Sequence, residues 1–162
     1  MKLDQQLQIL IEEASEQGVP AWAMEKAVIP ILKAFASQLQ HLEYYILQSR
    51  DRDWIVTTLS NVEKPQQEKR VIYAFSSPED AANSQENSNL EIAIASVPVT
   101  HLLFQLFALD GVESLIFLET PGNLEKGVEI FRASLQNGIH EQLKSLSPST
   151  PSKSQNIPSN LA

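Results

Sequence analysis

The residues of this chain best suited to metal binding are its three histidines, His41, His101 and His140. None has a second histidine three or four residues away, the spacing that places two ligands on one helix face. The sequence has no cysteine, so disulfides, thiolate nucleophiles and cysteine metal sites are excluded. We therefore predict no metal site, with His101 at the edge of a buried helix and His140 on a solvated one.

A second group of polar residues, Arg50-Asp51-Arg52-Asp53, lies between two apolar segments. Asp51 and Asp53 form an Asp-x-Asp pair, but no glycine or downstream glutamate completes a calcium loop, which favours a turn. At the tip of a hairpin, Arg50 and Arg52 could bind a carboxylate or an acidic partner. The alternative is that the tip is only solvated, because exposed ion pairs contribute little.

The sequence contains no Gly-rich phosphate loop, no nucleophile elbow and no pair of carboxylates in apolar surroundings. Its five glycines also give little opportunity for close backbone approach to a cofactor. We predict no catalytic residues and no cofactor, and therefore a protein that is not an enzyme.

Composition predicts one domain over residues 1–146, because 162 residues with 43% hydrophobic content can bury a core. The net charge of −8 and the scattered 12 basic residues argue against direct nucleic-acid binding. The first residues lack the apolar core of a signal peptide, and no apolar run approaches the roughly 18 residues of a membrane span. We expect a cytoplasmic protein without a membrane span.

The N-terminal segment predicts a pair of helices. The first begins near Leu3 and is closed by Gly18, and the second covers about residues 21–39. Pro30 lies inside the second helix, which predicts a kink or two short helices meeting near Ile29. Trp22 and Ile29, seven residues apart, fall off the main apolar stripe and form a possible protein-binding patch; the alternative is that the first helix covers them.

Aromatic and β-branched residues predict three strands at residues 42–48, 54–60 and 70–75, the first two joined as a hairpin through Arg50 to Asp53. After the third strand, Ser76-Ser77-Pro78-Glu79-Asp80 combines a serine N-cap, a proline at the first helical position and two acids. This pattern predicts a short helix.

The C-terminal half predicts a strand from Leu90 that ends at Pro98, a mostly buried helix over residues 99–109, and a central strand over residues 115–118. Asn123 is a possible N-cap for a long amphipathic helix. Its apolar stripe consists of Leu124, Val128, Phe131, Leu135, Ile139 and Leu143. Residues 147–162 are rich in Ser and Pro and are expected to be disordered.

These elements predict an α+β fold with an N-terminal helical pair, an antiparallel sheet meander with helices packed on one face, a long C-terminal helix and a disordered tail.

The segment Phe75-Ser76-Ser77-Pro78-Glu79-Asp80-Ala81 resembles the strand-to-helix turn of the SseB-like domain, a secretion-enhancer family related in shape to type III secretion chaperones. Val97-Pro98-Val99, Leu102-Leu103, Gly111-Val112 and Thr120-Pro121-Gly122 follow in the same order as in that family, with Thr120 where such domains tend to have Asn. The similarity covers about residues 70–143. It implies a non-enzymatic protein that binds other proteins, and it carries over no functional residues.

From these observations we expect a protein-binding adaptor or chaperone-like accessory subunit, serving a secretion or pilus and surface-assembly machine. Binding would use Trp22, Ile29, Arg50 and Arg52 or a sheet edge, and a homodimer is compatible with the sequence. The alternative is a small-molecule sensor with a pocket near His101, lined by Tyr44, Trp54 or Tyr73.

Overall fold

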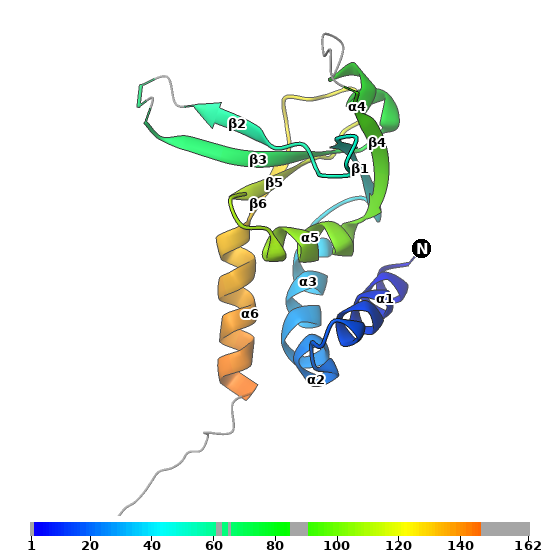
Figure 1. The fold of residues 1–162 in the computed structure, drawn as a ribbon, viewed down its shortest axis with the longest axis vertical. Helices are drawn as coiled ribbons and strands as arrows, with labels where there is room; N and C mark the ends of the chain where they lie inside the picture. Colours follow the sequence, from blue (N-terminus) through cyan, green and yellow to red (C-terminus); the bar gives the residue numbers. More distant parts are fainter. Residues whose placement is uncertain (1, 61–62, 65, 85–90, 147–162) are drawn as a thin grey trace, which may run out of the picture.

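The computed structural model describes residues 2–60, 63–64, 66–84 and 91–146. It is an α+β fold in which a mixed six-stranded sheet lies against a layer of helices, with a long helix at the C-terminal end of the described chain (Figure 1). The predicted fold class is therefore confirmed. The expected disorder of residues 147–162 and part of the predicted strand that begins at Leu90 lie outside the described residues.

The N-terminal helices are α1 (Leu3–Glu16) and a second helical stretch made of α2 (Ala21–Ala23), the π turn η1 (Met24–Val28) and α3 (Ile29–Ala36). Gly18 ends α1 with a φ of 90°, a conformation that glycine adopts without a steric penalty. The predicted helical pair is present, and two helical segments do meet at Ile29.

Pro30 explains the π turn. Proline has no N–H, and its ring collides with the carbonyl four residues earlier in a regular α-helix. Here the N–H of Ile29 bonds to the carbonyl of Met24, five residues back, so the chain takes in one extra residue just before the proline. The helix continues past Pro30 instead of breaking.

The sheet contains β1 (Glu43–Gln48), β2 (Thr57–Ser60), β3 (Glu68–Phe75), β4 (Ala93–Pro98), β5 (Ser114–Leu118) and β6 (Val128–Phe131). Its order is β4-β1-β3-β5-β6, and β2 also pairs with β3. β3 and β5 are parallel, whereas all other pairs are antiparallel. β3 is thus the middle strand, and β5 is an interior strand beside it.

The predicted antiparallel meander is corrected by this order. The turn after β1 forms, with an isolated bridge between Gln48 and Trp54, but β2 then leaves β1 and pairs with β3. β1 instead pairs with β4 over six residues. The physical reason is burial on both faces: Tyr44 and Ile46 of β1 face the helices, while Leu47 packs on the opposite face, so β1 belongs inside the sheet.

Two further predicted helices, α4 and α5, are also confirmed. In α4 (Pro78–Asn83) the Ser77 hydroxyl accepts a hydrogen bond from the N–H of Asp80 at 3.1 Å, as the N-cap pattern predicts. α5 (Val99–Ala108) buries most of its apolar residues beneath the sheet. The prediction that helices cover one face holds for the long helices only, because Ala81 of α4 packs with Leu47 and Phe75 on the other face.

The predicted long helix from Leu124 is wrong in its first part. Residues Val128–Phe131 form β6, paired antiparallel with β5, and α6 spans Arg132–Leu146. Asn123 accepts the N–H of Glu125 in a turn instead of capping a helix. The apolar residues of this segment are compatible with either a helix or a strand, and pairing with the buried β5 stabilises the strand.

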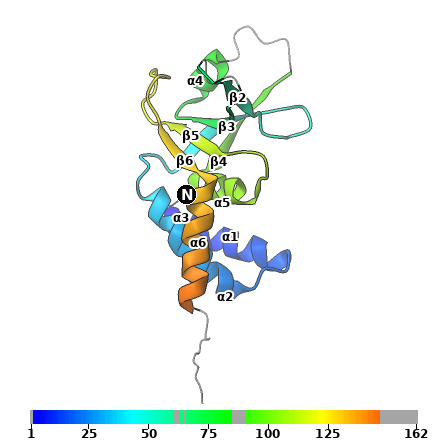
Figure 2. The same ribbon diagram turned by 90° about the vertical axis from the view of Figure 1, so that its left-hand side faces the viewer.

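The main core lies between the sheet and the helices. Met24, Leu32, Tyr44, Leu102, Phe117 and Leu135 are among its fully buried side chains. Figure 2 shows α6 and α3 extending from the sheet on the same side, with α1 and α2 beside them. Across the described ranges, no helix combines the length and the apolar character needed to cross a membrane.

Gly127 provides a test of how closely the chain approaches β5. A Cβ at this position would lie 2.9 Å from the Phe117 carbonyl oxygen, which is backbone and cannot move aside easily. Gly127→Ala is therefore expected to lower the free energy of unfolding by about 1–3 kcal/mol, measured by urea denaturation.

Gly138→Ala is the matched control. The atoms nearest to its Cβ would belong to the flexible Ile31 side chain, the first at 3.1 Å, and alanine gains up to about 1 kcal/mol over glycine inside a helix. We expect this variant to be as stable as the wild type or slightly more stable. Equal losses in the two variants would contradict the packing described for Gly127.

Candidate functional site

A buried acid, Glu119, is the centre of a polar cluster where β5 ends. The Tyr44 hydroxyl donates to Glu119 Oε1, and the N–H of Gln40 donates to Oε2 at 2.8 Å. The His41 Nε2–H donates to the Glu119 carbonyl at 2.9 Å. Through Glu119, these hydrogen bonds therefore connect the segment between α3 and β1, and Tyr44 of β1, to the end of β5.

Tyr44 is fully buried, and its ring packs edge-on against Phe117 with 4.9 Å between the ring centroids. Burial raises the pKa of the Tyr44 phenol far above its ordinary value, and the hydrogen bond and the negative charge of Glu119 raise it further. Tyr44 therefore remains a protonated donor, which suits a structural link and not a general base.

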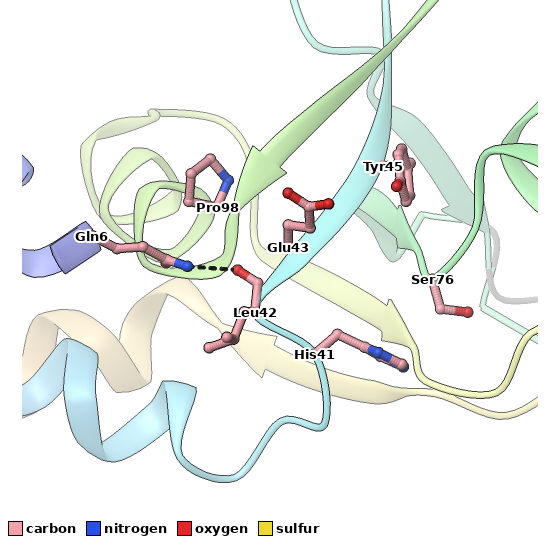
Figure 3. Close-up of a pocket in the computed structure, with 7 residues that line it drawn as sticks. All are labelled: Gln6, His41, Leu42, Glu43, Tyr45, Ser76 and Pro98. Carbon is pink, nitrogen blue, oxygen red and sulfur yellow. Dashed lines mark hydrogen bonds between the residues drawn. The ribbon is translucent and has the colours of Figure 1, made fainter. Parts of the chain in front are cut away.

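A cleft of about 380 Å³ lies beside this cluster, and we call it the β1 cleft. Figure 3 shows its lining side chains, with Gln6 reaching from α1 to the Leu42 carbonyl, to which its amide donates at 2.8 Å. In the part of the chain that is described, the buried Ser76 Oγ has no hydrogen-bond partner. The structure thus shows Ser76 and His41 lining one cleft without forming a nucleophile and base pair.

A larger groove of about 590 Å³ runs between α1 and α5 below the sheet, and we call it the α1–α5 groove. Its lining residues are Leu10, Glu13, Ala14, Gln17, Gln48, Trp54, Val97, His101, Phe104, Gln105 and Ala108. His101 Nε2 lies 3.3 Å from Glu13 Oε1, and within the described residues the buried Nδ1 has no partner. Apolar walls with a few polar groups are typical of ligand and peptide sites.

The structure brings together part of the pocket expected around His101. Trp54 and His101 line the α1–α5 groove. Tyr44 lies in the core instead, and Tyr73 lines a separate cleft of about 160 Å³ on the opposite face of the sheet. Tyr44 and Tyr73 are separated because adjacent positions of a strand face opposite sides of the sheet: Tyr44 shares its side with Ile72, not with Tyr73.

Arg50 and Arg52 lie at the turn after β1, as expected. Arg50 forms an ion pair with Glu91, both largely exposed, and Arg52 has a positive φ of 69°. Together they line an open cleft of about 590 Å³ beside β4. Arg50 thus binds a carboxylate of the chain itself, and an exposed pair of this kind contributes little to stability.

Trp22 and Ile29 have different surroundings. Trp22 is 57% exposed on α2, whereas Ile29 packs against the core. A regular helix would place the two residues on one face, but the extra residue of the π turn rotates the later part of the helix by about 100°. Trp22 therefore stands without Ile29 beside it at the surface.

An ion pair between Lys69 and Glu129, with 2.8 Å between Nζ and Oε2, joins β3 to β6. Burial alone would raise the pKa of Glu129, but hydrogen bonds from Lys69 and Ser114 outweigh it and lower that pKa below its usual value. Lys69 also lies 5.5 Å from the centre of the Phe131 ring. Glu129, the one charged residue of β6, is therefore paired with residues of the same sheet.

Sequence reasoning missed the buried polar residues Glu119, Gln6 and Asp80. Gln6 lies within the apolar stripe of α1, next to Leu7, and that position is a signal of burial that could have been used. Asp80 accepts the N–H of Gly122 at 2.9 Å, a long-range contact that no local pattern reveals.

No group of three or more His, Asp or Glu side chains placed to hold a metal ion occurs over residues 2–60, 63–64, 66–84 and 91–146.

The search of protein-family models gave no match to this chain, and the search of curated proteins gave none either.

Tyr44→Phe tests the role of the buried cluster. The substitution leaves Glu119 Oε1 buried without its hydroxyl donor, so we expect the free energy of unfolding at pH 7 to fall by about 1–3 kcal/mol. Tyr45→Phe is the matched control, because Tyr45 is only partly buried on the opposite face of the strand.

The same pair of variants predicts a pH dependence. Unfolded Tyr44 has a pKa of about 10, and the folded pKa is raised, so the contribution of the protonated phenol is complete below about pH 10. It is lost as the pH rises from about 10 toward the folded pKa. The stability difference between wild type and Tyr44→Phe should therefore narrow above about pH 10, measured by denaturant titration; a constant difference would contradict the assignment.

Proposed function

We propose that this chain is a non-enzymatic, cytoplasmic adaptor or chaperone-like accessory subunit that binds another protein through the end of its helical layer. The observation that carries the proposal is the exposure of Trp22. This side chain is 57% exposed, the largest value among the large apolar residues of the described chain. An exposed tryptophan supplies a large rigid apolar surface and one N–H donor, which favours protein contacts.

Two further apolar side chains support this location. Leu143 and Leu146, in the last turns of α6, are 38% and 39% exposed. Figures 1 and 2 both place α2 and the last turns of α6 at the end of the helical layer away from the sheet. We call Trp22, Leu143 and Leu146 the helical-end patch. Burial of such a patch against a partner would provide binding energy without any catalytic group.

The kind of partner is proposed from the resemblance of residues 70–143 to the SseB-like domain. That resemblance favours a component of a secretion or surface-assembly machine. The net charge of −8 would keep such an adaptor dispersed and would repel nucleic acid. A homodimer through the same patch is compatible with this proposal.

A second candidate function is small-molecule sensing in the α1–α5 groove. The observation that favours it is that Trp54 and His101 line one groove of about 590 Å³, a volume within the range of ligand sites. A thermal-shift screen of metabolites tests it. A genuine ligand should stabilise the wild type but not a Phe104→Glu variant, which places a charge in the groove.

The adaptor proposal is tested with Trp22→Ala. A partner is first captured from a lysate of the source cells and then purified, and its affinity for each variant is measured by calorimetry. Truncating a central tryptophan is expected to weaken binding by about 30-fold, which corresponds to about 2 kcal/mol.

Leu124→Ala is the matched control, because Leu124 is 42% exposed but precedes β6 and lies outside the helical-end patch. Its affinity should remain within about twofold of the wild type. A chain ending at Leu146 should bind as well as the full chain. If Trp22→Ala and Leu124→Ala bind equally well, the helical-end patch is not the binding surface.

A further inference from the structure

β4 is an unusual edge strand. Among the described strands it ends the sheet order and pairs with β1 alone, so its outer side faces away from the sheet (Figure 1). Its sequence, Ala-Ile-Ala-Ser-Val-Pro, carries no charged residue, and Ala93, Ile94 and Ser96 are exposed. Natural edge strands are usually protected by charges, bulges or covering segments, since unpaired backbone groups invite another strand.

The other edges differ from β4. β6 and β2 are four residues each, and β6 carries Glu129, which Lys69 and Ser114 bind. β4 has six residues and therefore extends about 20 Å. In the described part of the chain, it is the longest strand with a free side, and it is the one best suited to pair with an added strand.

The α1–α5 groove lies next to this edge. Val97 of β4 lines the groove on the sheet side, and Glu13 and Gln17 of α1 line it on the helix side. A strand added beside β4 would direct every second side chain toward the helical layer. Those side chains would meet Val97, Phe104 and Ala108, so backbone pairing and side-chain recognition would occur together.

The negative charge of α1 restricts which peptide sequences could bind beside β4. Asp4, Glu12, Glu13 and Glu16 are exposed on this helix, which carries no lysine or arginine over Leu3–Glu16. Glu13 is the acid that reaches the groove. An added strand with a lysine or arginine among its groove-facing side chains would therefore be attracted, whereas an acidic one would be repelled.

We propose that β4 binds an extended peptide segment of a partner protein by strand addition, with apolar side chains and one basic side chain entering the α1–α5 groove. This site is independent of the helical-end patch. It differs from the small-molecule hypothesis because the peptide backbone, and not only the groove, is recognised.

The test uses a blocked hexapeptide, Thr-Val-Thr-Val-Thr-Lys, in which Val, Val and Lys share one side. Its affinity for the full chain is measured by fluorescence anisotropy. Replacing the peptide lysine by glutamate should weaken binding by at least about tenfold, since attraction to Glu13 becomes repulsion. Glu13→Lys should reverse this preference, and Glu12→Lys, an equal charge change outside the groove lining, should not.

Backbone pairing is tested with two N-methylated peptides, one methylated on the Val and Lys residues and one on the Thr residues. In an added strand, successive N–H groups point to opposite sides, so only one set faces β4. One isomer should lose at least about tenfold in affinity and the other should bind nearly as well as the parent peptide.

The outcomes that overturn the proposal are clear. They are no binding of the parent peptide at about 1 mM, equal affinity of both methylated isomers, or equal effects of Glu12→Lys and Glu13→Lys. In the Trp22→Ala variant, which removes the centre of the helical-end patch, a dimer in sedimentation velocity that the peptide does not dissociate would also overturn it, because a second copy would then occupy β4. Trp22→Ala should leave peptide affinity unchanged, so failure here and failure of the helical-end patch can be told apart.

Discussion

The parallel pairing of β3 with β5 sets the arrangement of the rest of the domain. Parallel neighbours cannot be joined by a tight turn, so the chain between them must cross over the sheet. That crossover contains α4, β4 and α5, and it places β4 at the edge and α5 beneath the sheet. Both the open edge and the α1–α5 groove are consequences of this single pairing.

Buried polar contacts then fix the segments that the sheet does not hold. Gln6 accepts from the Thr100 hydroxyl at 2.9 Å and donates to the Leu42 carbonyl, which joins α1 to α5 and to the start of β1. Glu119 joins the same β1 segment to β5, and Asp80 joins α4 to the turn at Gly122. Because an unpaired buried polar group is costly, these contacts specify one arrangement of the helices and loops.

Local signals predicted what depends on neighbours in sequence. The serine cap of α4, the buried α5 and the stop at Gly18 were all correct because their causes lie within a few residues. The errors concern non-local choices. Residues Val128–Phe131 fit a helical stripe, yet they form a strand because they pair with β5. Similarly, β2 pairs with β3 and not with β1, a pairing that the local sequence does not determine.

The candidate surfaces show the same division. The sequence left open whether the first helix covers Trp22, and the separation of Trp22 from Ile29 depends on a π turn that Pro30 induces. The edge position of β4 could not be read from its sequence, since Ala93–Pro98 reads equally well as an interior strand. Its lack of charge gained meaning only once the sheet order was known. A strand whose composition suits the interior but which lies at the edge leaves backbone groups unpaired on its outer side, and the peptide strand that we propose would pair with them.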